Sequence, residues 1–121
     1  MRVFKYIGYP IFIKVKEMNA AKGRTMCDMR GMLSFQILFL LSRSQMHGEQ
    51  LATEIGKRRG EKPKAGTIYP ALKELRAKRL ILGKRSGKLI VYALTPLGRE
   101  TIKYATDYFC RAFGDIIALK K

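Results

Sequence analysis

The sequence predicts a mainly α-helical domain that carries one small β-hairpin, an α+β fold. From residue 32 onward, segments with apolar residues at helical spacing follow one another, and a short strand-like run precedes the last of them. The chain has 121 residues, enough for about one domain, and 47% of them are hydrophobic. Its formal net charge of +16 indicates an anionic partner such as nucleic acid.

Residues 1–31 are expected to form an N-terminal extension of this domain. Ile11, Ile13 and Val15 alternate with aromatic or basic residues, which is the period of a strand. The extension is therefore either an extended arm or a strand added to the edge of a sheet. A third alternative is that it stems from an upstream start codon, because Met18, Met26, Met29 and Met32 are possible internal starts.

The composition argues against several locations and kinds of site. The longest apolar runs fall short of the ~18–20 residues that a membrane span needs. The N-terminal apolar stretch is interrupted and has no clean cleavage site, so we expect a cytoplasmic protein without membrane contact. Cys27 and Cys110 cannot build a disulfide framework or a paired zinc site. With His47 as the only histidine, we expect no catalytic residue, no metal and no cofactor.

The domain is expected to begin with two helices. The segment from Met32 to Leu41 is apolar on nearly every side, as is typical of a helix buried between other elements. A polar break follows, and Gly48 is expected to cap the second helix, Glu49 to Arg59, whose apolar residues share one face. The basic cluster at residues 57–64 adds charge that a phosphate backbone would attract.

A third helix is predicted after a short turn. Gly66 or Thr67 is expected to be its N-cap, so that Pro70 falls in the first turn, where a missing N–H costs little. Tyr69 and Lys73 lie away from its apolar stripe, which consists of Ile68, Ala71, Leu72 and Leu75. An exposed tyrosine beside basic residues favours a binding helix, and packing against the neighbouring helix is the alternative for Tyr69.

A β-hairpin and a final helix complete the domain. Residues 80–82 and 88–94 have strand character, and residues 83–87 (GKRSG) are expected to form a basic tip between them. Thr95 followed by Pro96 predicts the N-terminus of a helix.

The final helix, residues 96–121, is predicted to be a dimerisation helix. Its apolar residues follow the 3-4 spacing of heptad a and d positions, and aromatic residues widen the stripe. The residues expected in the dimer contact are Ile102, Ala105, Phe109, Ala112, Phe113 and Ile116. The aromatic residues of this helix could instead line a pocket for a small aromatic effector, and plain dimer packing is the preferred interpretation.

The order helix, helix, turn, helix, basic hairpin is that of a winged helix-turn-helix, predicted here for residues 32–95. In such folds a helix enters the major groove of double-stranded DNA, and its exposed N-terminal side chains meet base edges. Basic residues on the hairpin engage phosphates beside the groove. The residues predicted to contact DNA are Lys64, Thr67, Tyr69, Lys73, Arg76, Lys84, Arg85 and Lys88.

Three motifs resemble the PadR family of transcriptional regulators over about residues 31–117. They are Met46-His47-Gly48-Glu49-Gln50-Leu51, Gly66-Thr67-Ile68-Tyr69-Pro70-Ala71-Leu72 with Leu75, and Val91-Tyr92-Ala93-Leu94-Thr95 with Gly98. The resemblance implies a homodimer held by the C-terminal helix, and repression of transcription. The sequence departs from the family in its N-terminal extension and in having no tryptophan, which some members use to stack aromatic drugs.

These observations favour a sequence-specific dimeric repressor. Two-fold symmetry would require an inverted-repeat operator with half-sites about 34–36 Å apart. The alternative is a non-specific architectural nucleic-acid-binding protein, for which the net charge of +16 would suffice. An enzyme acting on nucleic acid is disfavoured, because the sequence lacks the clustered carboxylates of metal-dependent phosphoryl transfer.

Overall fold

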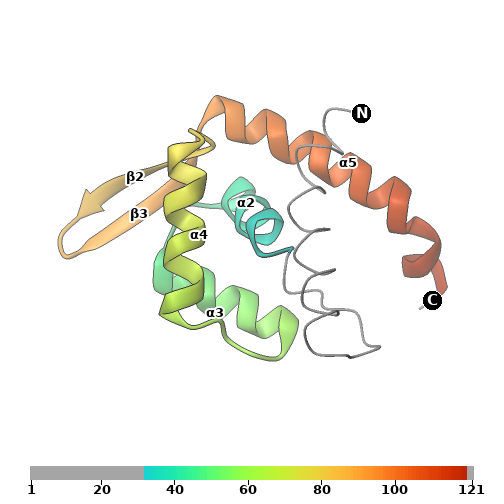
Figure 1. Cartoon of the computed structure of the whole chain (residues 1–121), viewed down its shortest axis with the longest axis horizontal. Helices are drawn as coiled ribbons and strands as arrows, with labels where there is room; N and C mark the ends of the chain where they lie inside the picture. The colour runs from blue at the N-terminus through green and yellow to red at the C-terminus, as the bar shows by residue number, and fades with distance from the viewer. Residues whose placement is uncertain (1–31, 120–121) are drawn as a thin grey trace, which may run out of the picture. The chain divides into compact units, whose positions relative to one another are not determined.

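A computed structural model describes residues 32–119 of the chain, and the predicted N-terminal extension lies outside them (Figure 1). The described residues form the predicted α+β fold, which consists of helices and a small antiparallel sheet. No helix in this part of the chain is long and apolar enough to cross a membrane. In chain order, the elements are α2 (Leu33–Arg43), β1 (Met46–His47), α3 (Gly48–Arg59), α4 (Ala65–Ala77), β2 (Ile81–Ser86), β3 (Leu89–Leu94) and α5 (Pro96–Leu119).

Residues 33–102 form one compact unit, and α5 from Lys103 onward belongs to a second. Within the first unit, α2 contacts α3, α4 and β3 and supplies the centre of the core (Figure 1). The prediction of a buried helix at residues 32–41 is confirmed for Leu33, Ile37, Leu38, Leu40 and Leu41, which are buried. Other residues of the segment are half-buried, and Phe39 is exposed beneath the guanidinium of Arg43. The largest fully buried side chains are Ile37, Leu38, Leu40, Leu51, Ile55, Ile68 and Leu72.

The sheet contains a short strand that the sequence does not reveal. Its strand order is β1-β3-β2, with Met46 opposite Tyr92 and His47 opposite Val91. Two residues are too few to show an alternating pattern, so β1 was expected to be part of a polar break. The pairing ties the start of α3 to the hairpin formed by β2 and β3.

The N-cap of α3 is His47, whereas the sequence suggested Gly48. The Gln50 backbone N–H donates to the His47 Nδ1 atom at 3.3 Å, and the His47 N–H donates to the Gln50 side-chain oxygen at 3.0 Å. This reciprocal pair is a capping box in which an imidazole takes the place of the usual hydroxyl or carboxylate. Gly48 is the first helical residue and is buried.

The capping box predicts a moderate loss of stability when the imidazole is removed. His47→Ala is expected to lower the free energy of unfolding by about 1 kcal/mol, because the Gln50 N–H loses its acceptor. Urea denaturation at a single protein concentration measures this. His47→Asn is the matched control and should retain most of the stability, since an asparagine oxygen also caps helices well. Equal losses in both variants would contradict a capping role for the side chain.

α4 begins two residues earlier than the sequence suggested. Its N-cap is Lys64, which makes no side-chain capping bond, and its carbonyl accepts from the N–H groups of Thr67 and Ile68 at 2.8 and 3.0 Å. Pro70 is therefore the sixth residue of the helix and lies inside it, not in the first turn. The helix tolerates a proline here because Gly66 is exposed. Pro70 has no N–H to donate to the Gly66 carbonyl, and this carbonyl belongs to a residue that water can reach.

The junction between α4, the hairpin and α5 is held by backbone carbonyl groups. The Leu80 N–H donates to the Leu75 carbonyl at 3.0 Å, while Arg79 takes a left-handed φ of 62°. The Thr95 hydroxyl donates to the Arg79 carbonyl at 2.7 Å and accepts from the Gly98 N–H at 2.9 Å. The Thr95 N–H donates to the Leu80 carbonyl at 3.1 Å, so the start of α5 is fastened to the end of α4.

The hairpin is longer in its strands and shorter in its turn than the sequence suggested. β2 extends through Ser86, and Ser86 pairs with Leu89, which leaves Gly87 and Lys88 as a two-residue turn. Gly87 has a φ of 64°, and Lys88 is not left-handed, as in a type II′ turn. Residues 83–86 therefore belong to a strand, and the predicted five-residue basic tip is wrong.

Candidate nucleic-acid interface

One row of exposed side chains runs along α4. Tyr69, Lys73 and Arg76 follow the spacing i, i+4 and i+7, which brings them to one side of the helix. The buried side of α4 consists of Ile68, Leu72 and Leu75, each at most 3% exposed. The core therefore sets the rotation of α4 about its axis, and this rotation leaves the row in solvent.

Tyr69 both packs against a neighbouring helix and remains accessible. Its side chain is 46% exposed. The three heavy atoms that a Cβ on Gly48 would meet first all belong to the Tyr69 ring or hydroxyl, so the ring lies directly against the first turn of α3. The packing that the sequence offered as the alternative for Tyr69 is therefore observed, while the rest of the ring faces solvent; its contact with DNA stays a prediction.

Arg76 connects α4 to the hairpin. Its guanidinium carbon lies 3.3 Å from the position that a Cβ on Gly83 would occupy, where Ile90 and Tyr92 atoms are also close, at 2.9 and 3.3 Å. Gly83 lies in β2 opposite Tyr92, so the end of the arginine lies over this strand. This contact places the end of the exposed row of α4 next to the hairpin of β2 and β3.

The hairpin carries its cations on different sides. Successive residues of a strand point to opposite faces, so Lys84 and Arg85 diverge. Arg85 shares a face with Gly83, over which Arg76 lies, while Lys84 is on the outer face opposite Val91. Lys88 is in the turn. All three cations are exposed, although only Lys88 is at the tip.

Lys64 and Thr67 lie at the N-terminal end of α4. Both are exposed, and Lys64 is the N-cap residue. Thr67 is on the side of the helix shared with Pro70 and Glu74, so it does not join the row of Tyr69, Lys73 and Arg76. The row of Tyr69, Lys73 and Arg76 and the Thr67 side chain therefore lie on different sides of α4.

Charge is concentrated between Lys64 and Lys88. This segment contains eight basic residues and one acidic residue, Glu74, which pairs with Lys78 at 3.3 Å. The excess of positive charge is distributed over α4 and the hairpin, and solvent-exposed cations of this kind attract the phosphates of a duplex.

The basic cluster at the end of α3 differs, because most of its cations have partners within the chain. Lys57 and Arg58 pair with Glu54 at 3.1 and 2.9 Å, and Lys62 pairs with Glu49. The Arg58 and Lys57 hydrogen bonds hold the pKa of the Glu54 carboxyl below its usual value. Arg59 donates to the Gln36 side chain at 2.5 Å. Glu49 and Glu54 therefore offset part of the positive charge that the sequence places in this cluster.

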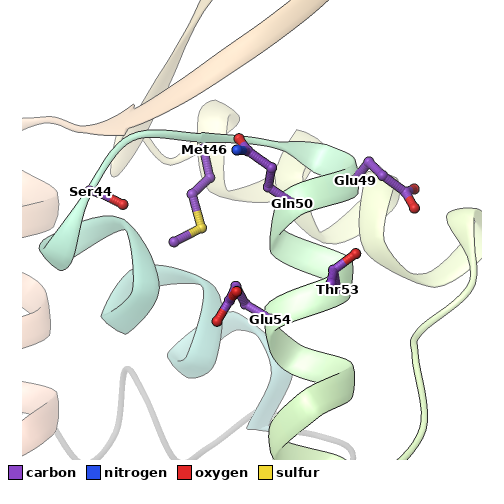
Figure 2. A pocket seen from close by; sticks show the side chains of 6 residues that line it. All are labelled: Ser44, Met46, Glu49, Gln50, Thr53 and Glu54. Atoms are coloured by element: carbon purple, nitrogen blue, oxygen red, sulfur yellow. The ribbon is translucent and has the colours of Figure 1, made fainter.

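A shallow hollow of about 230 Å³ lies beside α3, between this helix and the segment that follows α2 (Figure 2). Met46 points into it, and the Glu54 carboxylate faces it from α3. The remaining lining residues are Ser44, Glu49, Gln50 and Thr53. Both carboxylates are already paired with cations, and the described residues contain no group of three or more potential metal ligands. The hollow therefore offers neither a cation for DNA nor a metal centre.

The residues predicted for the dimer contact have unequal exposure in the single chain. Ile102 and Ala105 are only 4% and 2% exposed, so they are covered without a second copy. Phe109 and Phe113 are half-buried, and their ring centroids are 5.0 Å apart. Ala112 is exposed and Ile116 is 60% exposed. The accessible part of the predicted stripe therefore begins near Phe109.

The sequence matches the family model described as the transcriptional regulator PadR-like family over residues 37–104, more than half of the chain. The chain belongs to the PadR-like family of transcriptional regulators. The matched residues extend from α2 into α5 and include the whole of α3, α4 and the hairpin, so the family's shared region contains the surface described above. No curated protein matches the sequence.

Solved structures of other regulators resemble this PadR-like chain. H. salinarum RosR, in a structure described as the complex hsRosR-S1, is 25% identical, with 66% of this chain and 72% of that chain covered and a TM-score of 0.62. A PadR family transcription regulator from Clostridium difficile is 23% identical, with 73% and 96% covered and a TM-score of 0.63. A transcriptional regulator from Clostridium thermocellum is 23% identical, with 77% and 94% covered and a TM-score of 0.65. The fold of the PadR-like chain is thus that of winged-helix regulators.

Two residues of this surface escaped the sequence-based prediction. Gly48 lies against Tyr69, and Gly83 lies against Arg76, because neither glycine has a side chain in the way. No helical or strand pattern in the sequence reveals such a contact. The available signal for Gly48 was its place in the PadR-like motif Met46-His47-Gly48. For Gly83, the sequence held no signal beyond its position in a glycine-containing hairpin.

Proposed function

We propose that this PadR-like protein is a sequence-specific DNA-binding repressor that acts as a homodimer. Residues 32–95 bind DNA, with α4 in the major groove and the hairpin on the adjoining backbone, and residues 96–121 dimerise. The bases are read by Tyr69, Lys73 and Thr67, and the phosphates are bound by Lys64, Arg76 and the three hairpin cations Lys84, Arg85 and Lys88.

The observation that carries this proposal is the exposed row of Tyr69, Lys73 and Arg76 on a helix whose other side is anchored in the core. The row combines a half-exposed aromatic ring with two cations, and ion pairs within the described residues do not engage Lys73 or Arg76. Arginine and lysine side chains on a groove-bound helix donate to guanine, and aromatic and hydroxyl groups contact bases and sugars. The surrounding charge then supplies the non-specific affinity.

The dimer rests on the apolar residues of α5 that stay accessible in the single chain. Ile116, Ile117 and Leu119 are 60%, 47% and 83% exposed, an unusual amount for the end of a helix in contact with water alone. We assign Phe109 and Phe113 to this contact and not to an effector pocket, because their rings already pack on each other. A symmetric dimer binds an inverted repeat.

The test is a binding measurement on a duplex selected by the wild-type protein from a library with a randomised central segment. Fluorescence anisotropy then compares the selected duplex with a scrambled duplex of the same length at several salt concentrations. We expect the selected duplex to bind at least ~10³-fold more tightly at fixed salt. Selection of no preferred sequence, with equal affinities and a steep salt dependence, would favour the architectural alternative, which the net charge of +16 supports.

Substitutions of two lysines should distinguish a base contact from non-specific attraction to phosphates. Lys73→Ala is expected to weaken binding to the selected duplex about tenfold and to the scrambled duplex much less, because a base contact is lost. Lys88→Ala should weaken both equally and reduce the salt slope by about 0.9.

Lys57→Ala is the matched control for these variants. This lysine is paired with Glu54 on α3, so its removal should change neither affinity appreciably. Equal effects of Lys73→Ala on the two duplexes would remove α4 from the role of reading helix.

A further inference from the structure

Gly48 lies in the first turn of α3, and Tyr69 lies in the second turn of α4. We infer that Gly48 is a positioning residue: the absence of its side chain creates a notch that seats the Tyr69 ring and fixes it on the DNA-reading surface. This inference rests on the proposed function, since it assigns the notch its role through the base contacts of Tyr69. Gly48 itself is buried and touches no DNA in this arrangement.

The notch is defined by the atoms that would fill it. A Cβ on Gly48 would lie 2.6 Å from the Tyr69 hydroxyl oxygen, 2.7 Å from Cε1 and 2.8 Å from Cζ. Carbon atoms in van der Waals contact are about 3.5–4.0 Å apart. Any side chain at position 48 must therefore displace the end of the tyrosine ring, by roughly an ångström.

The backbone conformation of Gly48 does not itself require glycine. Among the described residues, the left-handed glycines are Gly60 and Gly87, so Gly48 has a conformation that alanine can adopt. Alanine also favours helices more than glycine does. The ring of Tyr69 is thus the specific obstacle, which makes the effect of a substitution interpretable.

The notch is held in place on both sides. His47, immediately before Gly48, pairs with Val91 of the sheet and closes the capping box with Gln50. On the other side, Ile68 and Leu72, which flank Tyr69 in α4, are each 1% exposed. The ring is accordingly seated between two anchored elements and is 46% exposed. A side chain ordered before DNA binds loses less conformational entropy on binding.

The experiment is a coupling measurement with Gly48→Ala, Tyr69→Ala and the double variant. The probes are the duplex that the wild-type protein selects from the randomised library and the scrambled duplex. Gly48→Ala is expected to weaken binding to the selected duplex by about tenfold or more and binding to the scrambled duplex little. In the Tyr69→Ala background, the same substitution should change affinity less than about twofold, because the ring that it would displace is gone.

A second readout does not involve DNA. The chain has six tyrosines, and in ¹H–¹³C spectra of the ring carbons the Tyr69 signal is identified by its loss in Tyr69→Ala. Gly48→Ala should shift this signal in the free protein. The matched control is Gly114→Ala, a helical position where no neighbouring atom of the described residues lies within 4 Å of the added methyl group, and it should leave the Tyr69 signal unchanged.

Each outcome decides the matter. Wild-type affinity in Gly48→Ala, or equal losses from Gly48→Ala with and without Tyr69, would overturn the inference while the proposed function stands. If the wild-type protein selects no duplex, the proposed function is wrong, and the reading role of the notch is overturned with it. If Gly48→Ala does not fold, the double variant should regain the fold, and failure of both would show that Gly48 serves the backbone and not Tyr69.

Discussion

Gly98→Ala is expected to lower the free energy of unfolding by about 3 kcal/mol. A Cβ at this position would overlap the Leu80 carbonyl oxygen and come within 3.2 Å of a Leu94 methyl carbon. The obstacle is backbone, so no rotamer change relieves it. The Leu80 carbonyl also accepts from the Thr95 N–H, and moving it disturbs the cap in which the Thr95 hydroxyl accepts from the Gly98 N–H.

Urea denaturation at one protein concentration tests this prediction, because a dimer's apparent stability depends on concentration. Gly114→Ala in the same helix is the control and should raise stability by about 0.5–1 kcal/mol, since alanine is the better helix former and meets no atom there. A Gly98→Ala protein as stable as the wild type would mean that α5 does not start as closely against Leu80 as the structure has it.

Phe109→Glu is expected to convert the proposed dimer into a monomer of 13.8 kDa. Phe109 is half-buried against Phe113 in the single chain, and in the dimer it would lie at the start of the accessible apolar stripe. A carboxylate there would be desolvated without a cation, in each of two copies facing one another. Burial of an unpaired charge costs several kcal/mol, which is a large share of the stability of a small interface.

Sedimentation equilibrium measures the mass, and DNA binding should weaken with it because two half-sites no longer act together. Lys103→Glu is the control: it introduces the same carboxylate at an exposed position about 120° around α5 from Phe109 and should leave the dimer intact. If Phe109→Glu retains the mass of the wild-type protein, the heptad interpretation of α5 is wrong.

The elements that bury apolar residues were predictable, because burial leaves a period in the sequence. The apolar segment at residues 32–41 predicted α2, and the stripe of Ile68, Leu72 and Leu75 predicted the buried side of α4. The stripe also predicted that Tyr69 and Lys73 are exposed, which the structure confirms. Glycine and basic residues between two strand-like runs predicted the hairpin.

Element boundaries and caps were less predictable, because they depend on single backbone contacts. His47 caps α3 through its ring nitrogen, a role for which its residue type is uncommon. β1 exists through its pairing with Val91 and Tyr92, 44 to 46 positions along the chain, so no local pattern reveals it. The strands of the hairpin continue through residues 83–86 because Arg85 and Lys84 find partners in Ile90 and Val91.

The class of fold, the PadR-like family and the side of α4 that faces solvent follow from the amino-acid sequence, since periodicity, charge and motifs are properties of the chain alone. Only the packing of the elements shows which candidate residues lie beside one another. It seats Tyr69 against Gly48 and Arg76 over Gly83, and it ties the basic end of α3 to Glu49 and Glu54. The two glycine contacts join different elements of the fold. The decisive feature at each glycine is missing volume, which becomes visible only when the neighbouring element lies beside it.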